Sequence, residues 1–151
     1  MANYRTHTAF NVIITLPLLC GALYFFLSPK LFLFLTFVGA YLYTTFFMNP
    51  DLDIAHKIKP FSLRGILALP FRGYAKLFKH RGISHSFLFG SLTRVIWLTA
   101  LLFLLFYFIL PISLNKKDLI VFCHQYKSYL VYGLGGICCA DWSHLIVDYF
   151  S

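Results

Sequence analysis

The chain has 151 residues, of which 60% are hydrophobic, 20% are aromatic and only 12% are charged. Soluble domains average roughly 45–50% apolar and about 25% charged residues, so this composition excludes an ordinary soluble domain and indicates an integral membrane protein. The formal net charge is +8. In a chain this apolar, a surplus of basic residues favours membrane lipid headgroups as the partner. No nucleic-acid partner is expected. The length supports one domain, residues 1–151.

Four apolar segments approach the roughly 20 residues that a membrane-spanning helix needs. They lie at about residues 9–27, 31–48, 87–112 and 129–149. The first segment is expected to be a retained anchor, because no small-residue cleavage site follows it. Pro17 should kink it, because proline lacks the N–H that an interior helical turn requires. Together the segments predict an all-α, integral membrane four-helix bundle.

The segments between these spans differ in composition. Residues 54–79 alternate basic with aromatic and aliphatic side chains and are interrupted by Pro60, Pro70 and Gly73. This pattern is typical of an interfacial cytoplasmic loop, or of short helices in the headgroup layer. A solvated basic loop with a few apolar anchors is the alternative. Residues 113–128 are polar and predict a loop on the opposite side of the membrane.

The distribution of Lys and Arg sets the orientation. Most of them lie on the side that holds the N-terminus, residues 51–86 and the C-terminus, so the positive-inside rule places both termini in the cytoplasm. The expected compartment is a bacterial inner (cytoplasmic) membrane. The last span contains Gly133, Gly135 and Gly136. Small residues let neighbouring backbones approach closely, so we expect this span inside the bundle.

Histidine and aspartate side chains lie at the predicted cytoplasmic ends of all four spans. They are His7 before the first span, Asp51 and Asp53 after the second, His80 and His85 before the third, and His144 and Asp148 at the end of the fourth. Ionisable groups at membrane depth are costly, which makes them functional candidates. Their convergence at one end predicts a metal site there.

The fourth span offers two of these ligands on one face. His144 and Asp148 are four residues apart, which is about 40° around a helix and roughly 6 Å along it. Imidazole and carboxylate together suit zinc, manganese or iron. A His–Asp pair that neutralises itself inside the bundle is the alternative. Asp141 lies three residues earlier on nearly the same face and ranks lower as a ligand.

The block between residues 79 and 86 contributes further candidates. His80 and His85 are separated by Gly82, so a turn presents His80 while Ser84 caps the helix that follows. Arg81 lies inside this block. Its guanidinium can hold a phosphate oxygen pair in a bidentate contact.

Four short motifs carry a family resemblance. Arg5-Thr6-His7, Pro50-Asp51-Leu52-Asp53, His80-Arg81 with Ser84-His85, and Ser143-His144 followed by Asp148 resemble, in order and separation, the motifs of uncharacterised membrane-associated metal-binding proteins. A more distant similarity is to the YdjM-like membrane-bound metal-dependent hydrolases. Both groups resemble zinc-dependent phospholipases C and single-strand nucleases. His7, Asp51 and the pair His144 and Asp148 resemble the helical zinc ligands of those enzymes.

The resemblance implies one or two divalent ions, with zinc expected and manganese or iron as alternatives. The chain lacks the N-terminal amine ligand of the zinc enzymes and has fewer histidines, which argues against a three-metal site. The implied reaction is hydrolysis of a phosphoester in a phospholipid or other amphiphilic substrate by metal-activated water. Arg81, Arg94 and Asp53 are the catalytic candidates. Arg94 lies about 180° around a continuous helix from His85, and snorkelling to the headgroups explains it equally well.

Other functions remain open from the sequence. A non-catalytic metal-binding membrane protein would hold the same ligands in a closed shell. A small transporter would need polar groups through the membrane midplane, where the first three spans offer little beyond threonines. The cysteines Cys20, Cys123, Cys138 and Cys139 have no C-x-x-C spacing and predict free thiols. The sequence predicts no particular oligomeric state.

Overall fold

The computed structural model describes residues 4–48, 65, 70, 71, 73, 74, 89–109 and 115–150. Every secondary-structure element within these residues is a helix, which confirms the all-α prediction. The elements are α1 (Tyr4–Phe10), the π-helix η1 (Asn11–Thr15), α2 (Leu16–Leu27), α3 (Leu31–Phe47), α6 (Phe89–Ile109), α7 (Lys116–Gln125) and α8 (Lys127–Phe150).

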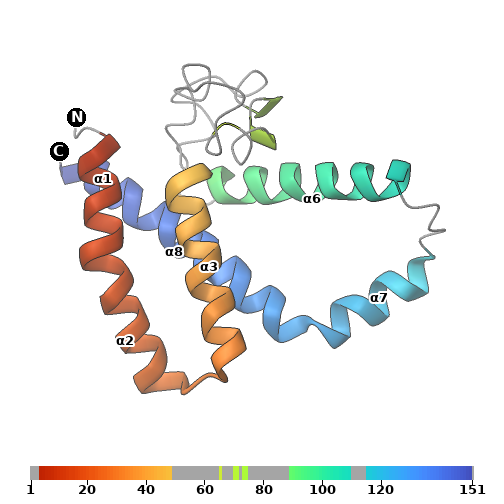
Figure 1. The fold of residues 1–151 in the computed structure, drawn as a ribbon, viewed down its shortest axis with the longest axis horizontal. Coiled ribbons are helices and arrows are strands. Elements are labelled where there is room, and N and C mark those ends of the chain that lie inside the picture. Colours follow the sequence, from red (N-terminus) through yellow and green to blue (C-terminus); the bar gives the residue numbers. More distant parts are fainter. Residues whose placement is uncertain are drawn as a thin grey trace.

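Helices α1, η1 and α2 form one continuous rod that is joined to α3 as a hairpin, and α8 crosses both of them (Figure 1). Phe37 and Tyr41 of α3 and Ala140 of α8 form a buried core at this crossing. That core is packed against three leucines of α2, which are Leu16, Leu19 and Leu23. The two chain ends therefore lie at the same end of the molecule (Figure 1).

Helix α8 approaches α3 closely at Gly136. A Cβ atom at this position would lie 2.5 Å from the carbonyl oxygen of Phe37 and 3.1 Å from the backbone nitrogen of Tyr41. No side chain fits in that space, so the two backbones meet only because the residue is glycine. This contact agrees with the close packing that the glycines of the last span predict.

Helix α6 departs from the predicted bundle. It extends crosswise, away from the unit formed by α1, α3 and α8 (Figure 1). Its first turns are held to α8, where Ser91 and Arg94 bond to Asp141. The apolar side chains farther along, such as Leu102 and Phe108, are exposed. The described helices therefore do not form a bundle of four parallel rods.

Two helical stretches are long and apolar enough to cross a membrane, judged by length and composition alone. They are Thr6–Leu27 and Lys127–Phe150. Leu31–Phe47 and Phe89–Leu105 are apolar but shorter. The core helix of a soluble protein and an N-terminal signal sequence pass the same test. The prediction of four membrane spans is therefore not confirmed.

The polar segment before α8 was expected to be a loop, and this prediction was wrong. The segment forms α7, whose N-cap Asn115 accepts a hydrogen bond from the Lys117 N–H at 3.4 Å. A side-chain acceptor at this position satisfies one of the free N–H groups of the first turn. Polarity alone therefore did not distinguish a solvated helix from a loop.

The central basic and aromatic segment is described only in part. Pro70, Phe71, Gly73 and Tyr74 are helical. Phe71 and Tyr74 are buried with Met48 in a second core cluster, and the Trp97 indole donates a hydrogen bond of 2.8 Å to the Pro70 carbonyl. These two aromatic side chains therefore pack inside the protein. In an interfacial segment they would instead face the lipid headgroups.

Candidate metal centre

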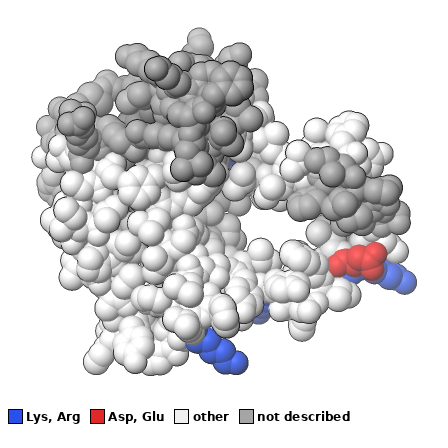
Figure 2. Space-filling view, in the orientation of Figure 1, with Lys and Arg blue, Asp and Glu red and all other residues white. Residues whose placement is uncertain are grey.

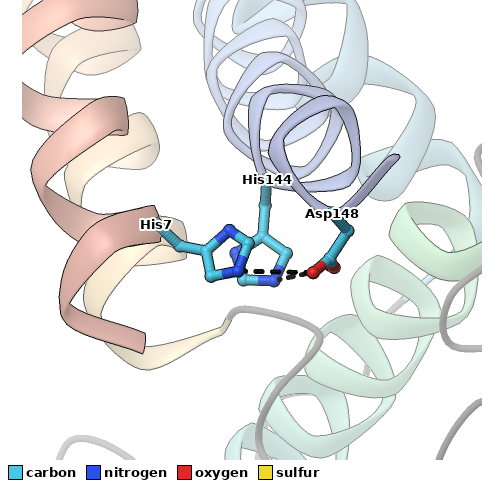
Figure 3. Close-up of side chains that lie close together, drawn as sticks. All are labelled: His7, His144 and Asp148. Carbon is cyan, nitrogen blue, oxygen red and sulfur yellow. Dashed lines mark ion pairs between the residues drawn. The ribbon is translucent and has the colours of Figure 1, made fainter. Parts of the chain in front are cut away.

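Two histidines and an aspartate from opposite ends of the chain meet in one cluster (Figure 3). His7 comes from α1, and His144 and Asp148 come from α8. His7 Nε2 lies 3.3 Å from Asp148 Oδ1, and His144 Nε2 lies 3.4 Å from Asp148 Oδ2. The two imidazole rings stack with their centroids 4.2 Å apart. One ligand atom from each residue lies within 4.8 Å of the other two.

The histidine–aspartate distances are longer than direct charge-assisted hydrogen bonds, which are about 2.7–2.9 Å long. Each is close to the roughly 3.3–3.4 Å that separates two ligand atoms bonded at about 2.0–2.1 Å to a tetrahedral ion. The two distances run to different oxygens of Asp148, and one ligand atom from each of the three residues lies within 4.8 Å of the other two. Two imidazoles and a carboxylate are a donor set that zinc, manganese and iron accept. The residues present therefore fit a divalent metal ion.

The cluster is largely buried. His7 and His144 are only 1% and 2% exposed, whereas the Asp148 side chain is 22% exposed. Of the three side chains, Asp148 is therefore the most open to solvent. Neutral imidazoles and carboxylates are the forms of these side chains that bind metals.

A π turn positions His7 within the first rod. The backbone N–H of Leu16 bonds to the Asn11 carbonyl, five residues earlier. In an α-helix the Pro17 ring would clash with the carbonyl of Ile13, and the wider π turn relieves that clash. The distortion predicted at Pro17 therefore takes the form of a π turn just before it.

The π turn also decides which way His7 faces. Each residue turns an α-helix by about 100°, so one extra residue in a turn rotates the preceding helix by that angle. In an unbroken α-helix, His7 would lie about 150° from the leucine face of α2 that packs on the core. The π turn reduces this angle to about 50°. His7 can therefore reach α8 because η1 is not α-helical.

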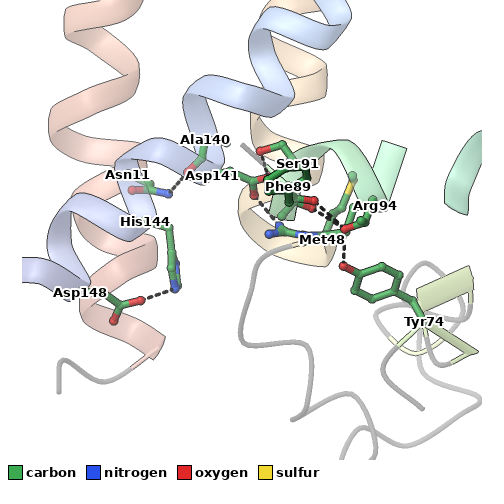
Figure 4. A network of polar contacts seen from close by, with 12 residues as sticks. Asn11, Met48, Tyr74, Phe89, Ser91, Arg94, Ala140, Asp141, His144 and Asp148 are labelled. Carbon is green, nitrogen blue, oxygen red and sulfur yellow. Dashed lines mark hydrogen bonds and ion pairs between the residues drawn. The ribbon is translucent and has the colours of Figure 1, made fainter. Parts of the chain in front are cut away.

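A second buried polar network lies beside the first on α8 (Figure 4). Arg94 Nη1 donates to Asp141 Oδ1 at 2.6 Å and to the Met48 carbonyl at 2.8 Å. The Ser91 hydroxyl donates to Asp141 Oδ2 at 2.6 Å. Arg94 and Asp141 are each 1% exposed. The network ties the end of α3 and the start of α6 to α8.

The structure brings together three of the seven predicted metal ligands, His7, His144 and Asp148. The other four predicted ligands, and two of the three catalytic candidates, lie outside the described residues. The ligands are Asp51, Asp53, His80 and His85, and the catalytic candidates are Asp53 and Arg81. Arg94, the other basic candidate, bonds to Asp141. The catalytic roles stay predictions.

Sequence reasoning missed two residues that support the cluster. Asn11 lies one turn after His7 and donates from Nδ2 to the Ala140 carbonyl at 3.3 Å. The Tyr41 hydroxyl bonds to the Asn11 carbonyl and to Ser143 Oγ. An amide four residues from a histidine in an apolar span was a usable signal. Tyr41 gave no such signal, because 20% of the chain is aromatic.

Comparison with known proteins identifies one family. No curated protein and no solved structure matches the chain. The profile of a family described as uncharacterized metal-binding protein (DUF2227) matches residues 2–151, which include His7, His144 and Asp148. That description agrees with the donor set of the cluster. The chain therefore belongs to the uncharacterized metal-binding protein family DUF2227.

Proposed function

We propose that this protein is a membrane-embedded, metal-dependent hydrolase that acts on a phosphoester in a lipid or other amphiphilic substrate. The observation that carries the proposal is the meeting of His7, His144 and Asp148, with ligand atoms within 4.8 Å of one another, in a chain of a metal-binding family. Zinc is the proposed ion, and manganese and iron suit the same donors.

Among the described residues the cluster offers three protein ligands, and the proposed hydrolysis requires one coordination position that stays open to water. Structural zinc sites are closed by four protein ligands, whereas catalytic sites keep one position open. Partial exposure of Asp148, at 22%, gives the cluster a side from which a substrate can arrive. A divalent ion held there would polarise a phosphoryl oxygen and lower the pKa of a coordinated water towards about 7.

The proposal includes the predicted ligands that lie outside the described residues. Asp51 and Asp53 come shortly after Met48, whose carbonyl is bonded to Arg94, which is bonded to Asp141 of α8. Asp51 and Asp53 remain proposed ligands for the same ion or a second one. His80, His85 and the phosphate-binding role of Arg81 belong to the same proposal.

A non-catalytic metal site is the second candidate, and one observation favours it. His7 and His144 are almost fully buried, at 1% and 2% exposed, as ligands of a closed structural shell are. A fourth ligand from the chain would complete that shell. The donor set and the family description fit this function as well as they fit hydrolysis.

The membrane location is supported by the surface of the helices. The apolar window of Thr6–Leu27 is only 6% buried within the protein, which differs from the core helix of a soluble protein. Figure 2 shows charged side chains near the turn between α2 and α3 and on α7, with a small basic patch between them, while most of the other described surface on this face is uncharged. An uncharged, apolar outer surface suits contact with lipid tails.

Metal analysis and hydrolysis assays of the protein purified in detergent test the proposal. Wild type is expected to retain about one zinc per chain or more, and His144→Ala and His7→Ala should lose it, because each removes one of three ligands. Hydrolysis of phosphodiester or phosphomonoester lipids that stops on chelation would support the enzyme. Bound metal without hydrolysis would favour the closed site, and absence of metal would overturn both.

A further inference from the structure

Asn11 sets the register between the first rod and α8. Its Nδ2 donates to the Ala140 carbonyl at 3.3 Å. Asn11 follows His7 by four residues, and Ala140 precedes His144 by four. The two helices run antiparallel, so residues four positions before Asn11 and four positions after Ala140 face each other one turn along. The hydrogen bond between Asn11 and Ala140 therefore places His7 opposite His144. The two imidazoles stack in this position.

The backbone of Asn11 is fixed as firmly as its side chain. Its carbonyl accepts the Leu16 N–H of the π turn, the Thr15 hydroxyl at 2.9 Å and the Tyr41 hydroxyl at 3.2 Å. The Tyr41 hydroxyl also bonds to Ser143 Oγ at 3.3 Å. One residue thus joins the first rod, α3 and α8 directly beneath the histidines.

Packing alone does not explain an amide at this position. Asn11 is 1% exposed, and no described residue donates a hydrogen bond to its Oδ1. Leaving a buried acceptor without a donor costs free energy, and an aliphatic side chain of similar size would avoid that cost. The bond from Nδ2 to Ala140 is the contribution that only the amide makes.

We propose that Asn11 is a positioning residue of the metal centre, which holds His7 beside His144 so that the two imidazoles can bind the same divalent ion. The inference rests on the proposed metal binding by His7, His144 and Asp148. Residues that orient ligands without touching the metal typically change metal affinity by about 10- to 100-fold when replaced.

Cobalt binding to the full chain in detergent tests this role, because cobalt reports both affinity and ligand geometry through its absorption spectrum. Asn11→Leu removes the amide at nearly constant volume and is expected to weaken Co²⁺ binding by about 10- to 100-fold and to change the spectrum. Ser91→Ala is the matched control. It removes a buried hydrogen bond to α8 from the other network, so it should leave the cobalt affinity and spectrum unchanged.

Tyr41→Phe keeps the inference testable if Asn11→Leu does not fold. It removes the hydroxyl that braces Asn11 and should weaken cobalt binding by about two- to tenfold, the equivalent of one hydrogen bond. Wild-type affinity and spectrum in a folded Asn11→Leu or Tyr41→Phe variant would overturn the positioning role alone. If His144→Ala bound cobalt as wild type does, the metal site itself would be overturned.

Discussion

The two carboxylates of α8, Asp141 and Asp148, differ in the length of their contacts with neighbouring side chains. Both oxygens of Asp141 accept short hydrogen bonds of 2.6 Å, from Arg94 and Ser91. The contacts of Asp148 with the histidines are 3.3 and 3.4 Å long. A carboxylate already occupied by donors has little capacity left for a metal ion, so the geometry favours Asp148 as a ligand and Asp141 as a clamp between helices.

If the Arg94–Asp141 pair clamps the helices, removing Asp141 should lower the stability strongly, and a second substitution at Arg94 should restore most of it. Asp141→Leu leaves the Arg94 guanidinium buried without its carboxylate, and breaking a buried pair in this way costs about 3–5 kcal/mol. Thermal unfolding in detergent should show a lower midpoint for this variant. Replacing both partners by apolar side chains of similar volume, as Arg94→Met with Asp141→Leu, should restore most of the stability.

The double variant also separates two roles of Arg94. If Arg94 only clamps the helices, the double variant should bind metal as wild type does and keep any hydrolysis that wild type shows. Loss of hydrolysis with metal binding intact would instead assign Arg94 to the substrate phosphate. A double variant no more stable than Asp141→Leu would contradict the clamp.

The apolar helices were predictable from the sequence to within a few residues, whereas the polar helix α7 was not. The segment 31–48 corresponds to Leu31–Phe47, and the segment 129–149 to Lys127–Phe150. The direction of α6 was not predictable, because it is set where Ser91 meets Asp141 and not by hydropathy. The π turn escaped prediction for a related reason, since its phase shift is stabilised by contacts with other helices.

Gly136 gives a prediction for the crossing of α3 and α8. A Cβ at Gly136 would lie 2.5 Å from the Phe37 carbonyl oxygen, and because that atom belongs to the backbone, the helices must separate. Gly136→Ala should therefore lower the unfolding midpoint and weaken metal binding, since α8 carries two ligands. Gly21→Ala is the control. Nothing lies within 4 Å of its added Cβ, and alanine is favoured over glycine inside a helix by about 1 kcal/mol.

A midpoint for Gly136→Ala that rises as much as that of Gly21→Ala would show that the two helices can separate at no cost. It would then contradict the close backbone contact at the crossing. Both variants replace a helical glycine by alanine, so their difference isolates the contact from the intrinsic helix preference.

On the scale of the whole molecule, the meeting of His7 with His144 and Asp148 was predicted from a four-span topology. Four spans would return the chain to its starting side, so residues before the first span and at the end of the last one would approach each other. The structure brings these three residues together, although its described helices do not form the predicted four-span bundle. The pairing of Arg94 with Asp141 could not be predicted in this way. It depends on the rotation of two helices about their axes, which spacing along one helix does not determine.

The proposed orientation places α7 outside the cytoplasm and the metal cluster inside it, and cysteine labelling can distinguish the two sides. Cys123 is an exposed thiol on α7. In a variant with Ala at Cys20, Cys138 and Cys139, a membrane-impermeant maleimide should label Cys123 in intact cells, because the proposed orientation places this thiol outside the cytoplasm. Thr6→Cys in the same background without Cys123 is the control, and it should react only after the membrane is permeabilised. If only the Thr6→Cys variant is labelled in intact cells, the orientation is the opposite of the proposed one. If neither variant is labelled before permeabilisation, no membrane span separates α7 from the cluster.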